Sequence, residues 1–180
     1  MRTLLRGKAV KILLAVDGSE HSARTVETMG SHPWPSGSLV RVLSVVDQVV
    51  TATPEVAIFS AEAIEAERDQ LLRTADELTT RFAHWLCSNG LVAENQIRRG
   101  DPKSVIIEEA EEWGADLIVV GSHGHTGFKQ WLLGSVAQSI VSHASCSVYV
   151  VRERREKQTA EKPEPVAPAK EPLRGTAAGQ

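Results

Sequence analysis

A nearly unbroken run of β-favouring apolar residues close to the amino end constrains the fold of this chain more than any other segment. Residues 9–17 read Ala-Val-Lys-Ile-Leu-Leu-Ala-Val-Asp, and the run stops at Asp-Gly-Ser, which is a turn and helix-entry signal. A strand without alternating polar positions is typical of parallel sheets, whose two faces are both covered by helices. The run therefore predicts a buried first strand in an α/β domain.

The rest of the chain alternates helical and strand-like segments. Further strands are predicted at residues 39–46, 92–98, 116–120 and 147–152. Helices are predicted at residues 20–29 with Gly30 as the stop, from about residue 54 to Asn89, at residues 102–113 after the N-cap Asp101, and at residues 135–143. Five strands alternating with four helices imply α/β architecture: a single doubly wound five-stranded parallel sheet with helices on both faces, Rossmann-like and suited to nucleotide binding.

Composition limits the chain to one folded domain and a tail. With 180 residues, of which 42% are hydrophobic, the chain has room for one core, which we expect within residues 8–152. Residues 153–180 are charged and rich in proline and alanine, and they carry too little apolar surface to fold. We therefore predict a disordered C-terminal tail.

Charge and hydropathy exclude several classes of partner. The formal net charge of -3 lacks the basic excess of nucleic-acid binders, so we expect no nucleic-acid partner. The N-terminus has no apolar signal-peptide region, and no stretch approaches the roughly 20 apolar residues that span a bilayer. We therefore expect no membrane association and a cytoplasmic location.

A glycine-rich loop between the predicted fourth strand and last helix is the candidate binding site. Gly121, Gly124 and Gly134 allow main-chain N–H groups to approach an anion without interference from a Cβ. Ser135, at the start of the next helix, adds a hydroxyl where free N–H groups and the helix dipole favour negative charge. If strands one and four are neighbours, Asp17 meets this loop where the winding direction of the sheet reverses, which is where ligands bind in such folds.

The spacing Gly121-x2-Gly124-x9-Gly134-Ser135, between an apolar strand and a helix, resembles the ATP-binding signature of the universal stress proteins. The likeness extends over most of residues 8–152, and includes the ends of the first two strands, the turn at residues 99–102 and the fourth strand. It implies an ATP-binding protein of that family. The positions that the resemblance assigns to the nucleotide are Asp17 beside it, Val45 with its backbone at the adenine, and Gly121, Gly124, Gly134 and Ser135 at the ribose and phosphates.

One residue departs from the pattern of the family. Nucleotide-binding members often carry a second hydroxyl after the signature serine, where this chain has Val136. This departure removes one possible phosphate donor and predicts weaker binding. Asp17 would repel phosphates unless it faces the base or ribose or a cation intervenes, so we expect Mg²⁺ to accompany ATP.

The leading functional hypothesis is a regulatory stress-response protein whose conformation or partner preference depends on bound ATP. The alternatives are a nucleotide-free protein-interaction module of the same fold, and a slow ATPase. The sequence contains neither a Gly-x4-Gly-Lys-Ser/Thr phosphate loop nor an obvious positioned base, which argues against efficient catalysis. The resemblance also suggests a homodimer formed by antiparallel pairing of the last strand, residues 147–152, whereas the tail covering that edge is the alternative.

Simpler interpretations of the same residues stay open. The glycine loop can be a surface connection, and Asp17 can serve only to stabilise the start of the first helix. His123 and His125 form a His-x-His pair that can chelate a metal, although solvated loop histidines are ordinary. Lys129 can neutralise phosphate or be solvated, and residues 131–133 are expected to anchor the loop to the core.

Overall fold

The computed structural model describes residues 8–47, 61–124 and 133–152. They form nine elements in the predicted alternation: β1 (Lys11–Ala15), α1 (Glu20–Ser31), β2 (Leu39–Val46), α2 (Ala61–Ser88), β3 (Val92–Arg99), α3 (Pro102–Trp113), β4 (Leu117–Gly121), α4 (Ser135–His143) and β5 (Ser147–Val151). The expected tail, and the loop residues His125, Lys129, Trp131 and Leu132, lie outside the described residues.

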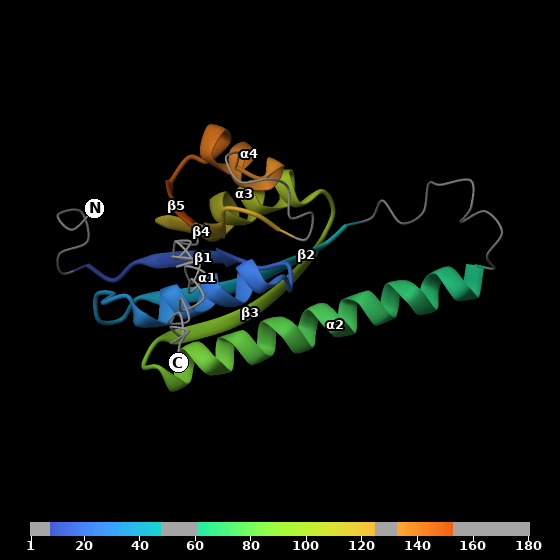
Figure 1. Ribbon diagram of the computed structural model, residues 1–180, viewed down its shortest axis with the longest axis horizontal. Coiled ribbons are helices and arrows are strands. Elements are labelled where there is room, and N and C mark those ends of the chain that lie inside the picture. The colour runs from blue at the N-terminus through green and yellow to red at the C-terminus, as the bar shows by residue number, and fades with distance from the viewer. Residues whose placement is uncertain (1–7, 48–60, 125–132, 153–180) are drawn as a thin grey trace, which may run out of the picture.

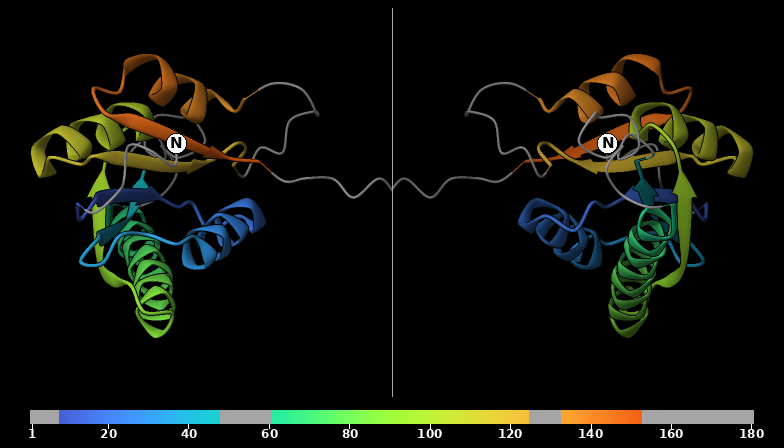
Figure 2. Two further views of the ribbon diagram at one scale, coloured as in Figure 1. Left: turned by 90° about the vertical axis from the view of Figure 1, so that its left-hand side faces the viewer. Right: turned by 90° about the vertical axis from the view of Figure 1, so that its right-hand side faces the viewer.

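The strands form one sheet in the order β3-β2-β1-β4-β5, and every neighbouring pair is parallel. Helices α1 and α2 cover one face, and α3 and α4 cover the other (Figures 1 and 2). The chain winds outward from β1 to β3 and then returns across the sheet to β4, so the winding reverses between β1 and β4. The predicted doubly wound α/β fold and the adjacency of the first and fourth strands are both confirmed.

The first strand is buried on both faces, as its unbroken apolar run indicates. Ile12 and Leu14 are fully buried in a core cluster that includes residues of α1 and α2. Leu13, which points to the opposite face, is fully buried in a second cluster with residues of α3 and α4. Burial of one such side chain stabilises the fold by about 1.5–3 kcal/mol. Because helices pack against both faces of β1, the strand that leads to the candidate site is fixed in the core.

Gly30 does not end α1, contrary to the prediction. The helix continues to Ser31, and the backbone N–H of the C-cap residue His32 donates to the carbonyl of Met29. A Cβ at Gly30 would lie 2.6 Å from Cη2 of Trp85, which belongs to α2. The glycine therefore allows the indole of Trp85 to pack directly against the backbone of α1.

The longest helix, α2, extends past the sheet in Figure 1. It begins at Ala61 in the described part of the chain, and the earlier part of the helix predicted from about residue 54 lies outside the described residues. Its buried positions, among them Ala75, Ala83 and Leu86, lie in the carboxyl-terminal half of the helix. None of the helices in the described ranges has the length and hydropathy of a membrane span.

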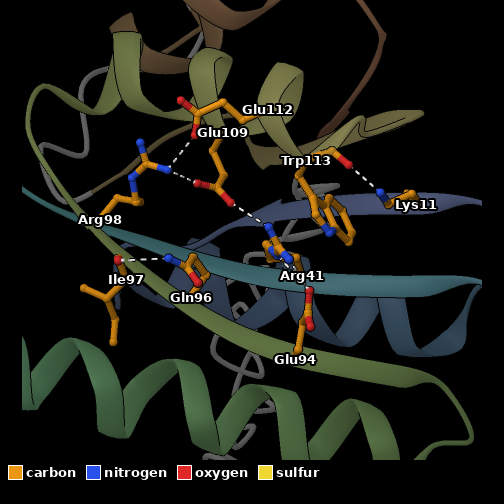
Figure 3. A network of polar contacts seen from close by, with 9 residues as sticks. All are labelled: Lys11, Arg41, Glu94, Gln96, Ile97, Arg98, Glu109, Glu112 and Trp113. Carbon is orange, nitrogen blue, oxygen red and sulfur yellow. Dashed lines mark hydrogen bonds and ion pairs between the residues drawn. The ribbon is translucent and has the colours of Figure 1, made fainter.

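A network of ion pairs fastens α3 to β2 and β3 (Figure 3). The side chain of Glu109 is only 4% exposed and pairs with Arg41 at 2.8 Å and with Arg98. Arg98 also pairs with Glu112 at 3.0 Å, and this hydrogen bond, together with the charge of Glu109, raises the pKa of Arg98 above its ordinary value. The guanidinium of Arg41 lies 4.3 Å from the ring centre of Trp113. These contacts hold α3 in place over the sheet.

Candidate functional site

The carboxyl ends of β1 and β4 meet at the reversal point of the sheet. Asp17 follows β1 after one further residue and is exposed, whereas Gly124 lies three residues beyond the end of β4. A Cβ built at Gly124 would lie 2.5 Å from Oδ2 of Asp17, so the carboxylate rests against the glycine backbone. Tertiary structure thus brings together two candidate residues separated by more than a hundred positions in the sequence.

Asp17 is held by hydroxyl and amide groups from the start of α1. Its Oδ1 accepts hydrogen bonds from the backbone N–H of Ser19 at 3.0 Å, from Oγ of Ser19 at 2.6 Å and from Oγ of Ser22. Ser19 is also the N-cap of α1 and accepts from the backbone N–H of Ser22. Asp17 therefore does stabilise the start of the helix, while its Oδ2 lies against Gly124.

Ser22 was not among the residues singled out from the sequence. It is buried on the face of α1 that also buries Val26 and Met29, positions i+4 and i+7 from it. A serine on an apolar helix face is unusual because a buried hydroxyl needs a hydrogen-bond partner. The serine on this apolar face is therefore the sequence signal that could have identified Ser22. The hydrogen-bond partner of its hydroxyl is the Asp17 carboxylate.

One backbone hydrogen bond joins the two ends of the glycine loop, and a second connects the start of the loop to β5. The N–H of Gly134 donates to the carbonyl of Ser122 at 2.9 Å, and the N–H of Ser122 donates to the carbonyl of Val151 in β5 at 2.9 Å. Gly134 is the N-cap of α4 and offers no side chain to bond the first amides of the helix. Ser135, the first residue of α4, is exposed. The start of α4 is therefore an uncapped helix N-terminus at the end of β4.

Val45 lies where β2 continues past β1. The pairing of β1 with β2 ends at Ala15 and Leu43, so Val45 lies two residues beyond the last paired residue of β2. The carbonyl of Leu43 accepts from Val16 on the β1 side, and that of Val46 accepts from Gly100 on the β3 side. Because successive residues of a strand direct their backbone groups to opposite neighbours, the N–H and C=O of Val45 face the β1 side.

His123 lies between the first two glycines and has one partnered ring nitrogen. Its Nδ1 lies 3.1 Å from Oγ of the buried Ser122. Its Nε2 is buried, and no hydrogen-bond partner for it occurs among the residues that the structure describes. The ring of His21, in the first turn of α1, lies 5.8 Å away between centroids. From the sequence, His123 is interpreted only as a metal ligand or a solvated loop histidine, because burial of one nitrogen has no sequence signal.

Two residues near the loop are explained by packing. Val136 and Leu133 are partly buried against the core cluster between the sheet and helices α3 and α4. Val136 replaces the hydroxyl residue that nucleotide-binding members often carry, which predicts weaker nucleotide binding. In this structure its side chain contributes to the apolar packing of that cluster. Leu133 packs as expected for a residue that anchors the loop.

Over the described ranges, no group of three or more His, Cys, Asp or Glu side chains is arranged to hold a metal ion.

Comparison with known proteins identifies related sequences. Residues 9–152 match the profile of the universal stress protein family. The chain is 28% identical over 145 residues to the universal stress protein YxiE of Bacillus subtilis, covering 79% of this chain and 98% of YxiE. It is 30% identical over 145 residues to a putative universal stress protein of Staphylococcus haemolyticus, covering 78% of this chain and 83% of that protein.

Solved structures share the fold. A structure of the protein MJ0577 matches with a TM-score of 0.70 and 27% identity, over 81% of this chain and 96% of the other. An Arabidopsis thaliana universal stress protein family member with AMP bound has a TM-score of 0.60, 22% identity, and coverage of 84% and 97%. A universal stress protein of Archaeoglobus fulgidus in complex with dAMP has a TM-score of 0.53, 21% identity, and coverage of 78% and 96%. The sequence match over residues 9–152 and the shared fold lead to one conclusion: this chain belongs to the universal stress protein family.

Proposed function

We propose that this protein binds ATP at the reversal point of the sheet and acts as a regulator of the stress response whose conformation or partner preference depends on nucleotide occupancy. The observation that carries the proposal is that the Asp17 carboxylate, the glycine backbone after β4 and the uncapped N-terminus of α4 converge at one point. The Asp17 carboxylate contacts Gly124, and the uncapped N-terminus of α4 begins at Gly134 beside the backbone of His123. The AMP and dAMP complexes of the two fold relatives support a nucleotide as the ligand class.

The residues fit a nucleotide with distinct roles for its two ends. Backbone amides near Gly124 and Gly134 and the hydroxyl of Ser135 would donate to phosphate oxygens, at roughly 1.5–3 kcal/mol for each hydrogen bond to a charged group. The backbone groups of Val45 would meet the adenine, since they face the β1 side beyond the last pair of strands. A few such contacts, less the entropy of binding, give micromolar affinity, or about -8 kcal/mol.

Asp17 places a negative charge near the bound phosphates. A carboxylate and a phosphate oxygen about 4 Å apart repel each other by roughly 1–4 kcal/mol, depending on exposure to solvent. The hydroxyls of Ser19 and Ser22 already bond Oδ1 of Asp17 and stabilise its charge. We therefore propose that Mg²⁺ accompanies ATP and offsets this repulsion, and ATP affinity measured with and without MgCl2 tests the point.

The decisive experiment is mass spectrometry of small molecules released from the purified protein, followed by calorimetric titration with ATP. The exposed hydroxyl of Ser135 is the simplest test position, and Ser142, also exposed and on the same helix, is the matched control. We expect Ser135→Ala to weaken ATP binding about 10-fold and Ser142→Ala to leave it unchanged. A wild-type protein without retained nucleotide or measurable ATP affinity would instead favour a nucleotide-free interaction module.

A slow ATPase is the second candidate at the same site. Bound ATP and a cation supply part of what phosphoryl transfer requires, whereas the sequence shows no phosphate-loop lysine or positioned base. We expect at most slow release of ADP or AMP. Turnover that exceeds the background of a Gly124→Val protein by orders of magnitude would establish an enzyme.

We also propose that the protein forms a homodimer through the outer edge of β5, with the predicted segment 147–152 as the interface. β5 is an outer strand of the sheet and carries four consecutive apolar residues, whereas the opposite outer strand, β3, carries Glu94, Arg98 and Arg99. Charged side chains on an outer strand oppose pairing, and an apolar outer strand favours it.

The backbone register selects the residue that tests this interface. Because the carbonyl of Val151 accepts from Ser122 beside β4, the backbone of Val150 faces the outer edge of the sheet, away from β4. Val150→Pro removes an edge-facing N–H, and Val150→Thr keeps it. Sedimentation should give a monomer for the proline variant and a dimer for the threonine variant, and a dimer in both would assign the contact elsewhere.

A further inference from the structure

The buried Nε2 atom of His123 is an unusual feature of the described part of the chain. Among the described residues that are not exposed, it is the one side-chain nitrogen or oxygen that is buried and has no hydrogen-bond partner. Buried polar atoms are nearly always paired, and each exception calls for a physical explanation. A site that binds a ligand provides such an explanation, because the missing partner arrives with the ligand.

The neighbour of the ring determines what Nε2 can offer. Ser122 is 4% exposed, and its Oγ lies 3.1 Å from Nδ1 of His123. When the serine hydroxyl donates to Nδ1, a neutral imidazole carries its proton on Nε2. In that tautomer Nε2 is a buried donor that requires an acceptor. A serine hydroxyl that donates to Nδ1 therefore leaves the opposite ring nitrogen as the donor.

The surroundings of the ring favour an acceptor with negative charge. A Cβ at Gly134 would lie 3.6 Å from Cα of His123, so the first turn of α4 begins beside the histidine. The N-terminus of α1 is capped by Ser19, whereas Gly134 provides α4 with no side-chain cap. An uncapped helix N-terminus beside the backbone of a residue that carries an imidazole donor matches the oxygens of a phosphate group.

We propose that His123 Nε2–H donates a hydrogen bond to a phosphate oxygen of the bound nucleotide, and that Ser122 fixes the tautomer that makes this possible. This inference rests on the proposed nucleotide-binding function. His123 is not one of the glycine or serine positions of the signature, so the proposal adds a further residue to the nucleotide site. The contact is to phosphate, so it contributes to ATP binding and leaves adenosine binding unchanged.

Two amide substitutions separate this role from a structural one. The side-chain amide of His123→Gln reaches the position of Nε2 and retains a donor there. The shorter side chain of His123→Asn reaches only the position of Nδ1, where it can still bond Ser122, as the imidazole does now. We expect His123→Asn and His123→Ala to weaken ATP binding about 10-fold and His123→Gln to stay within about 3-fold of wild type.

The control and the ligand series complete the experiment. His143→Gln changes an exposed histidine at the end of α4 and should leave ATP affinity unchanged. Adenosine should bind all variants equally. Without ligand, the melting temperature of the Asn variant should equal or exceed that of wild type, because this variant removes the donor at Nε2 and keeps a partner for Ser122. Long-range proton–nitrogen NMR spectra should show the Nε2–H tautomer with ATP bound.

Each failure has its own meaning. Equal ATP affinity in wild type and all three His123 variants would overturn the contact and leave nucleotide binding intact. Loss of adenosine affinity in parallel with ATP would overturn the assignment to phosphate. A lower melting temperature for the Asn variant without ligand would show that Nε2 has a partner in the protein itself. A wild-type protein that binds neither ATP nor adenosine would overturn both this inference and the proposed function.

Discussion

The contact between Gly124 and Asp17 leads to a quantitative prediction about why this position of the signature is a glycine. Replacement by alanine places a Cβ 2.5 Å from Oδ2 of Asp17. Heavy atoms in ordinary contact are about 3.5 Å apart, so the carboxylate has to retreat by about 1 Å. Gly124 is therefore required in the absence of any ligand, because the Asp17 carboxylate occupies the space of a side chain.

The cost follows from what holds Asp17 in place. Its Oδ1 accepts three hydrogen bonds, from Ser19 N, Ser19 Oγ and Ser22 Oγ, and a retreat of the carboxylate weakens them. A hydrogen bond to a charged group is worth about 1.5–3 kcal/mol, and the lower value applies because Asp17 is exposed and water replaces part of what is lost. We expect Gly124→Ala to reduce the free energy of unfolding by about 2 kcal/mol, that is, by somewhat more than one such bond.

Urea unfolding of four proteins tests this reasoning: wild type, Gly124→Ala, Asp17→Ala and the double variant. With the carboxylate removed, the added methyl group has nothing to displace, so Gly124→Ala in the Asp17→Ala background should cost less than about 0.5 kcal/mol. The cycle then gives a coupling energy of about 1.5 kcal/mol. Strictly additive effects of the two substitutions would refute the account, since the glycine would then be needed for reasons unrelated to Asp17.

Two further predictions concern the body of the fold. Glu109→Gln should lower the free energy of unfolding, measured in urea titrations, by about 2–3 kcal/mol. This is somewhat less than for a fully buried pair, because both arginine partners of Glu109 are partly exposed. A change below about 0.5 kcal/mol would contradict the role of the network. Burial raises the pKa of the Cys146 thiol. The folded state therefore favours the protonated thiol. The stabilisation that results is fully present below the pKa of this thiol in the unfolded chain, about 8.5. It is lost as the pH rises through the higher pKa of the thiol in the folded protein. Wild type should lose more stability than Cys146→Ala between pH 8 and pH 10, and native Cys146 should react with iodoacetamide more slowly than the exposed Cys87.

Local sequence patterns were sufficient to predict the order of the elements and the class of the fold. The unbroken apolar run at residues 9–16 predicts burial on both faces, and β1 is the central strand. Asp101 and Pro102 mark the start of α3, where the Asp101 side chain accepts from the backbone N–H of Ser104. These signals act within a few residues of the chain, so they can be recognised without knowing the fold.

Contacts between distant segments could not be predicted in this way. Gly30 looks like a helix stop because the Trp85 ring that requires it belongs to another helix. Glu109 lies in a helix with several exposed acidic residues, and only the approach of Arg41 and Arg98 from two strands distinguishes it as a buried charge. That Nε2 of His123 is buried with no partner among the described residues is visible only once burial has been established for each atom.

The sequence by itself determined where strands and helices form, that the sheet is parallel with a buried first strand, and which glycines and serine make a candidate anion site. These properties follow from hydrophobic periodicity and from the backbone preferences of single residues, both of which are local. Only the tertiary structure decided that Asp17 rests on Gly124, that Ser22 holds the carboxylate, and that one nitrogen of His123 is buried without a partner among the described residues. The first and last of these properties depend on the crossing of the chain from β3 to β4, which places the ends of β1 and β4 side by side.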